Sequence, residues 1–76
     1  MEIILVGSDL MKKLRVKAGY TQKQLAKRIG VTQSYISKIE KGKAGGLTIN
    51  NLTKLAHALQ VRPEKLLHIL LETKEE

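Results

Sequence analysis

The sequence predicts an all-helical fold of five short helices around one core, and three observations support it. Apolar residues recur every three or four positions along most of the chain, the interval at which side chains share one face of a helix. Threonine and glycine stand where these runs begin and end, and these residue types cap helices and stop them. The chain has 76 residues, of which 42% are hydrophobic, so it has room for one core and one domain.

The first two helices are predicted from the residues that cap and stop them. The first begins with Ser8 as its N-cap and stops at Gly19. The second covers Gln22–Ile29, between the N-cap Thr21 and the stop Gly30. Helical spacing predicts inward faces of Leu10, Met11, Leu14 and Ala18 in the first helix, and of Leu25, Ala26 and Ile29 in the second.

The third helix follows Thr32, runs from Gln33 to about Lys41 and stops at Gly42. It has two distinct sides, because residues placed at 100° intervals around the helix form an apolar side and a polar side. Apolar Ile36 and Ile39 share one side. The opposite side carries Ser34, Ser37, Lys38 and Lys41.

Two further helices are predicted after a glycine-rich loop at residues 42–47. Thr48 caps the fourth, whose expected apolar arc is Ile49, Leu52, Leu55, Ala56 and Leu59. Pro63 lies in the first turn of the fifth, where a missing N–H is harmless. The fifth helix has more apolar residues than one face can hide, namely Leu66, Leu67, Ile69, Leu70 and Leu71.

The expected organisation is therefore a single domain over residues 1–76. Residues 1–7 form a short extended arm, residues 8–72 the helical core and residues 73–76 a frayed tail. Within the arm, Ile3–Val6 reads as a short strand or an extended segment, and a strand would need the core or a second copy of the chain as its partner.

Charge gives the first indication of function. The net charge is +7, and residues 1–47 carry ten Lys or Arg against three Asp or Glu, whereas residues 48–76 carry four of each. A basic excess on one part of a small domain indicates a polyanionic partner, either nucleic acid or an acidic membrane. A merely solvated cationic surface is the alternative.

Composition argues against several other functions. The chain has no cysteine, and its two histidines, His57 and His68, lie far apart without further ligands, so no metal site and no cofactor are expected. No catalytic group stands out, and Gly42-Lys43 lacks the other residues of a phosphate-binding loop, so we expect no enzyme. No apolar run reaches the roughly 18 residues of a membrane span, and Ile3–Val6 lacks the basic flank of a signal peptide. A cytoplasmic, nucleoid-associated protein is expected.

The junction between the second and third helices carries the most information. Only Gly30, Val31 and Thr32 separate the two helices, and Gly30 can adopt a left-handed conformation at no steric cost. Ala26 is small where the third helix must cross closely, and Ile36 attaches that helix to the core. The third helix would then present short polar side chains from its first turn, a shape suited to a major groove about 12 Å wide.

The segment TQKQLAKRIGVTQSYISKIEKG, residues 21–42, resembles the helix-turn-helix of the Cro/C1-type (XRE-like) family, which includes the lambdoid phage repressors. The resemblance covers roughly residues 9–71. It implies a lambda-repressor-like fold and sequence-specific binding of double-stranded DNA as a transcriptional regulator of repressor type. An antitoxin or a coactivator-like module, acting mainly through protein–protein binding, is the alternative.

The resemblance also implies roles for individual residues. Gln22 matches a glutamine placed against a DNA phosphate, and Gln33 matches a residue at the start of the recognition helix, about 33–41. A glutamine there pairs with adenine through two hydrogen bonds, worth roughly 1–3 kcal/mol of discrimination. Tyr35 contacts DNA or covers the edge of the core. The residues that the resemblance assigns to DNA are Gln22, Thr32, Gln33, Ser34, Tyr35, Ser37, Lys38, Lys41 and Lys43.

Two family features bear on the surroundings of that surface. The family pattern pairs Arg15 with Glu40 as a partly buried, structural ion pair. The segment from Gly42 to Leu52 is one residue longer than the pattern, with Ala44-Gly45-Gly46 where polar residues are common, so no DNA contact is carried over to this loop. Asn50 and Asn51, which follow it, either reach a phosphate or are simply exposed polar residues.

The expected partner is double-stranded DNA with a near-palindromic operator. A homodimer through the fifth helix or the Ile3–Val6 arm would present two recognition helices to successive turns of the duplex. RNA is a weaker candidate, because only two aromatic residues are available to stack on bases.

Overall fold

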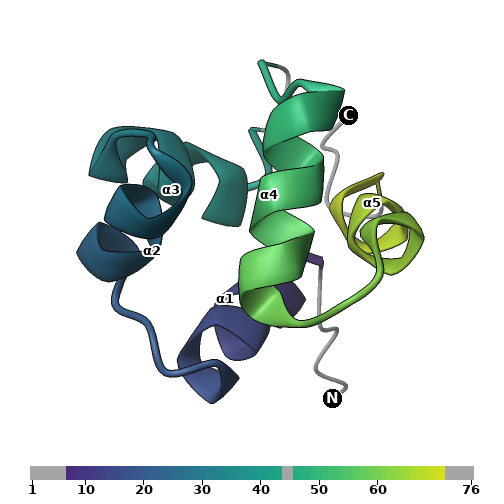
Figure 1. The fold of residues 1–76 in the computed structure, drawn as a ribbon. Coiled ribbons are helices and arrows are strands. Elements are labelled where there is room, and N and C mark those ends of the chain that lie inside the picture. The colour runs from purple at the N-terminus through teal and green to yellow at the C-terminus, as the bar shows by residue number, and fades with distance from the viewer. Residues whose placement is uncertain (1–6, 44–45, 72–76) are drawn as a thin grey trace.

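The computed structural model of the chain describes residues 7–43 and 46–71, and their side chains from Leu10 onward. This part of the chain contains helices and no strand. Its helices are α1 (Gly7–Lys17), α2 (Gln22–Ile29), α3 (Gln33–Glu40), α4 (Ile49–Leu59) and α5 (Pro63–Leu71). They enclose one core, with α4 between α5 and the α2–α3 pair (Figure 1). The predicted all-α, five-helix fold is confirmed.

The turn between α2 and α3 is built as the sequence predicts. Thr21 and Gln24 form a reciprocal capping box at the start of α2, with hydrogen bonds of 3.0 and 2.9 Å. Gly30 ends α2 at φ 78°, in the left-handed region that favours glycine. The N–H of Val31 then donates to the carbonyl of Ala26 at 2.9 Å, so the turn is closed onto α2 before α3 begins.

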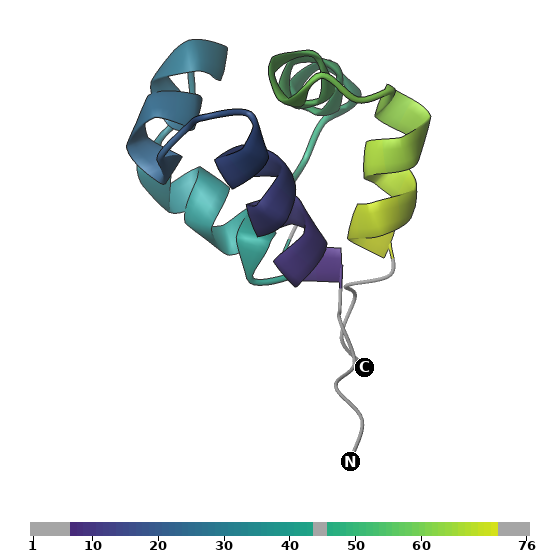
Figure 2. The ribbon, with the colours of Figure 1, turned by 90° about the horizontal axis from the view of Figure 1, so that it is seen from below.

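The core takes side chains from every helix. The largest side chains with almost no exposure are Met11, Leu25, Ile36, Ile39, Leu55 and Leu66. Burying a side chain of this kind stabilises a protein by roughly 1.5–3 kcal/mol. α1 packs against both α3 and α5, and α4 packs against α2 and α5 (Figure 2). Burial of Ile36 and Ile39 in this core fixes the position of α3.

Three details differ from the sequence prediction near helix ends. α1 already begins at Gly7, so Ser8 lies inside its first turn and is not the residue that precedes the helix. The most deeply buried residues of α1 are Met11 and Arg15, and the predicted inward residues beside them are only partly buried. α3 ends at Glu40, with Lys41 as its C-cap.

Ile49 was expected in the apolar arc of α4, and that expectation is wrong. Its side chain is 81% exposed, whereas the other four predicted members of the arc are buried. Ile49 is the first residue of α4, and a terminal turn has fewer neighbouring helices to cover it. Helical spacing identifies a shared face but does not say how far along the helix that face is covered.

α5 buries Leu66, Ile69 and Leu70 and leaves two leucines outside, with Leu67 43% and Leu71 62% exposed. Among the described residues, no helix has the length and apolar character that crossing a membrane requires. The predicted Ile3–Val6 arm, the tail at residues 73–76 and the loop residues Ala44 and Gly45 lie outside the described residues.

Candidate nucleic-acid interface

The first turn of α3 is an exposed polar surface. Thr32 is its N-cap, in extended conformation, and its Oγ1 accepts a hydrogen bond from the N–H of Tyr35 at 3.1 Å. Thr32, Gln33 and Ser34 are all exposed. Because the cap is part of the helix start, Thr32 has a structural role whether or not it also touches DNA.

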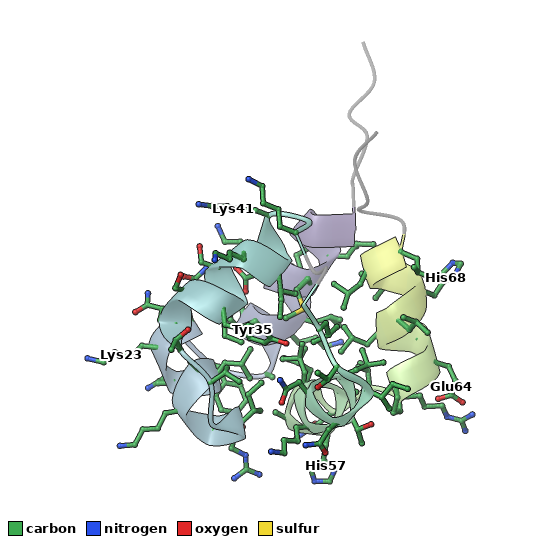
Figure 3. The ribbon with its side chains drawn as sticks, turned by 90° about the horizontal axis from the view of Figure 1, so that it is seen from above. Lys23, Tyr35, Lys41, His57, Glu64 and His68 are labelled. Atoms are coloured by element: carbon green, nitrogen blue, oxygen red, sulfur yellow. The ribbon has the colours of Figure 1, made fainter. Side chains whose placement is uncertain are left out.

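Three further polar residues, Ser37 and Lys38 of α3 and its C-cap Lys41, lie on the side away from the core. Lys38 and Lys41 are exposed and Ser37 is partly exposed. Figure 3 shows Lys41 projecting outward from the end of α3. Lys41 is eight residues after Gln33, so the two lie about 12 Å apart along the helix axis. The candidate surface therefore has an uncharged polar end and a basic end.

Lys43 extends the basic end beyond the helix. Its side chain is exposed, and its backbone N–H donates to the carbonyl of Lys38 at 2.9 Å. Gly42, at φ 83°, makes the tight turn that this hydrogen bond requires. Lys43 is thus held close to the last turn of α3 by its backbone, while its ammonium group remains free to reach solvent.

Beneath this surface, Arg15 of α1 and Glu40 of α3 form an ion pair. Arg15 Nε donates to Glu40 Oε2 at 2.5 Å, and another guanidinium N–H donates to Oε1 at 3.4 Å. A third donates to the carbonyl of Tyr20 at 2.8 Å. The two side chains are only 9% and 7% exposed, so the pair lies inside the protein and Glu40 does not belong to the exposed polar side of α3.

Gln22 joins the ion pair to the first turn of α3. Its Nε2 donates to Glu40 Oε1 at 2.9 Å, and its Oε1 accepts from Gln33 Nε2 at 3.4 Å. A carboxylate can only accept, so Glu40 dictates which end of the Gln22 amide turns inward. The outward end is then an acceptor, which selects the Nε2 end of Gln33 as its partner.

Tyr35 covers the edge of the core, one of the two roles that the sequence left open. Its ring is partly buried and packs against the core cluster, and its hydroxyl accepts from Asn51 Nδ2 at 3.3 Å. Figure 3 shows Tyr35 in the interior of the view, well inside the outer ring of charged side chains. Asn51 therefore ties the start of α4 to α3, whereas Asn50 is exposed.

The two packed helices, the glycine turn and the exposed first turn of α3 together constitute a helix-turn-helix. A family model described as helix-turn-helix matches residues 11–66, more than half of the chain. The chain belongs to the XRE-type helix-turn-helix family.

Proteins similar to this helix-turn-helix chain have regulatory names. A Neisseria meningitidis serogroup B protein named as a hypothetical transcription factor is 35% identical over 57 residues, which are 75% of this chain and 53% of that protein. A Sinorhizobium fredii protein named as an uncharacterized HTH-type transcriptional regulator is 40% identical over 57 residues, 75% of this chain and 71% of the relative. The chain spans about half of the length of the Neisseria protein. No solved structure matches the chain.

Sequence reasoning missed two contacts within this helix-turn-helix. It assigned Gln22 to a phosphate and did not foresee that its amide lies between Glu40 and Gln33. It also left open whether Asn51 is simply exposed, whereas this residue bonds Tyr35. In both cases the only signal was a polar residue at the first turn of a helix, which does not identify a partner.

Proposed function

We propose that this chain is a sequence-specific, double-stranded DNA-binding transcriptional regulator of repressor type, with α3 entering the major groove. The observation that carries the proposal is the division of α3 into a buried side, Ile36 and Ile39, and an exposed polar first turn. A helix held rigidly by its core side positions short polar groups against base edges without a further loss of conformational freedom. The regulatory names of both relatives agree with this function.

Gln33 is the proposed reader of a base. Its hydrogen bond to Gln22 uses one N–H of its amide, at a long 3.4 Å, and leaves the second N–H and the oxygen unused. Adenine presents one acceptor and one donor side by side in the major groove, at N7 and N6. The unused donor and acceptor of Gln33 match that pair. Ser34, exposed beside it, supplies a less selective hydroxyl.

Phosphate contacts are proposed for the surrounding residues. Gln22 retains a second N–H after donating to Glu40, and that N–H is available to a phosphate oxygen. Lys38, Lys41 and Lys43 are exposed at the other end of α3 and carry full charges. Thr32 and Ser37 are proposed to add hydroxyl contacts at the edges. Tyr35 is proposed to approach DNA through the outer edge of its ring or through its hydroxyl, which accepts from Asn51 and keeps its own O–H to donate.

Selection of binding sites from a random duplex library tests the function directly. We expect a short motif containing an adenine to be enriched, and the selected duplex to bind more tightly than a scrambled duplex of the same composition. A specific protein of this kind typically discriminates by a factor of roughly 10³–10⁷ over random DNA. Equal affinity for selected and scrambled duplexes would contradict sequence-specific binding.

Homodimerisation through α5 is the proposed way to lengthen the site. Leu67 and Leu71 are four residues apart, on one side of α5, and both are substantially exposed. A second copy of the chain would cover them by two-fold symmetry and place two recognition helices about 34 Å apart, which requires a near-palindromic operator.

Sedimentation equilibrium tests the dimer. Leu67→Asn with Leu71→Asn should shift the protein toward monomer, whereas Ile49→Asn, which removes a still more exposed apolar residue from α4, should not. A protein that stays monomeric at high concentration, with and without the selected duplex, would contradict the proposal.

The same two leucines favour the second candidate function, a helix-turn-helix module that acts mainly through another protein, as antitoxins and coactivator-like proteins do. In that case the protein should elute as a heteromeric complex when expressed with its native neighbours, and the isolated chain should fail to enrich any DNA motif.

A further inference from the structure

A second polar surface lies on the flank of the helix-turn-helix, between the end of α2 and the middle of α4. The two helices border an open groove of about 620 Å³. Its rim includes Lys27 and Arg28 from α2 and Lys54 from α4, together with His57. Figure 3 shows His57 projecting from the molecule on the side opposite to Lys41.

The three cations of the groove have no counter-charge. No aspartate or glutamate lines the groove, and Glu40 is paired with Arg15 outside it. Lys27 and Arg28 lie in the last turn of α2, where a positive charge complements the helix dipole, so their presence there has an ordinary structural explanation. Lys54 lies in the middle of α4 and has no such explanation. The groove is therefore a concentrated positive region with no internal partner.

The floor of the groove is apolar. Ile29 and Ala58 line it and are themselves well packed, with 5% and 6% exposure, and Gly30 adds bare backbone beside them. Protein–protein interfaces combine an apolar centre with a polar rim in this way. A phosphodiester backbone would pair with the cations but gain nothing from the apolar floor, whereas a peptide would use both.

The groove also faces away from the proposed DNA surface. On α2, Lys27 and Arg28 follow Gln22 by five and six residues, which places them about 140° and 120° away from it around the helix. On α4, His57 follows Asn51 by six residues and lies about 120° away, whereas Lys54 follows it by three and lies only about 60° away. Gln22 and Asn51 donate to or accept from residues of α3, so Lys27, Arg28 and His57 face away from the first turn of α3, and Lys54 lies closer to that side.

We propose that this groove binds an acidic segment of another protein, with an apolar side chain over Ile29 and Ala58 and flanking carboxylates on Lys27, Arg28 and Lys54. The contact goes beyond DNA binding, and it leaves the DNA surface free. A regulator with such a groove can hold a second protein beside the operator that it occupies.

Fluorescein-labelled peptides provide the test. The probes are short peptides of glutamate with one or two leucines, in several spacings, and matched peptides with glutamine in place of glutamate. Two protein variants lose the same charge, Arg28→Gln with Lys54→Gln in the groove and Lys38→Gln with Lys41→Gln on α3. All four residues are exposed, and urea unfolding of each variant checks that folding is unaffected.

Each variant is expected to lose one binding activity and to keep the other. The best glutamate peptide should bind the groove variant about tenfold more weakly than the wild type, since two charge contacts are lost, and the α3 variant almost as well as the wild type. Affinity for the selected duplex should fall mainly in the α3 variant.

Three outcomes would overturn the proposal. Equal losses of peptide binding in the two variants would mean that the peptide senses only net charge. A loss of duplex binding in the groove variant as large as in the α3 variant would assign the groove to DNA. Wild-type protein that binds no glutamate peptide more tightly than its glutamine counterpart would show that the groove does not recognise carboxylates. None of these results depends on whether DNA binding is sequence-specific, so the two proposals fail separately.

Discussion

Glu40 connects three helices through a single carboxylate. It accepts hydrogen bonds from Arg15 of α1 and from Gln22 of α2, and its own backbone belongs to α3. Its side chain is 7% exposed, so little water is available to replace a lost partner. A buried carboxylate without its cation is costly, and this cost makes the pair sensitive to substitution on either side.

Replacement of Arg15 by methionine tests this sensitivity, because methionine keeps most of the apolar stem and removes the guanidinium with its charge and its hydrogen bonds to Glu40 and Tyr20. We expect the free energy of unfolding to fall by roughly 3–5 kcal/mol, as for a buried ion pair that loses one partner. Urea titration measures the change. Lys12→Met is the matched control, since Lys12 is exposed on the same helix and should change stability by less than about 0.5 kcal/mol. Similar small effects from both variants would show that the pair is effectively solvated.

Gln33→Ala tests reading of a base. Loss of a base contact should weaken the selected duplex by about 1–3 kcal/mol and relax preference at a single base pair, with affinity for random DNA nearly unchanged. The measurement is binding to the selected duplex, to its single-base variants and to random DNA. Lys38→Ala serves as comparison, because a phosphate contact should weaken all duplexes alike. A uniform loss for Gln33→Ala would mean that this residue positions the protein and reads nothing.

At the scale of the element, the helix boundaries were largely predictable from the sequence, whereas the side-chain contacts between helices were not. Thr21, Thr32 and Thr48 cap α2, α3 and α4 as the sequence indicates, because a threonine before an apolar run satisfies local backbone N–H groups. The exposure of Ile49 was not predictable, because it depends on which neighbouring helices reach that turn. The same holds for Gln22, whose partners come from two other helices.

Gly30→Ala isolates the cost of the turn between α2 and α3. Gly30 has φ 78°, but apart from its two chain neighbours no residue comes within 4 Å of the position that an added Cβ would take. The variant should therefore lose about 1–2 kcal/mol of stability through backbone strain alone, without any clash. Gly46→Ala is the control, since its surroundings are equally open and no positive φ is recorded there. Thermal or urea unfolding distinguishes them, and equal stabilities would mean that the turn relaxes to a conformation open to any residue.

At the scale of the whole molecule, the net charge of +7 should govern how binding responds to salt. Each phosphate contact releases condensed counterions, so the logarithm of affinity falls linearly with the logarithm of salt concentration. Charges that touch DNA contribute to this slope, and charges on other faces do not. The described lysines and arginines lie on several faces of the molecule. Substitution of one of them at a time therefore separates their contributions to the salt dependence.

Lys41→Ala should reduce the magnitude of that slope by about 0.9, the value for one phosphate contact on duplex DNA. Titrations of the selected duplex at several salt concentrations measure it. Lys54→Ala removes the same charge from the α2–α4 groove and should leave the slope as in the wild type. Identical slopes for wild type and Lys41→Ala would show that Lys41 is only solvated.

The division of α3 also bears on how such a domain acquires a new target. The eight residues of α3 include Ile36 and Ile39, which are buried in the core, and Gln33 and Ser34, which are exposed in the first turn. If Gln33 and Ser34 read bases as proposed, substitutions at these two positions would alter binding preference without touching the packing that holds the helix. A lineage could then exchange one operator for another in single steps, each leaving a folded protein, because binding preference and stability would reside on opposite sides of the same short helix.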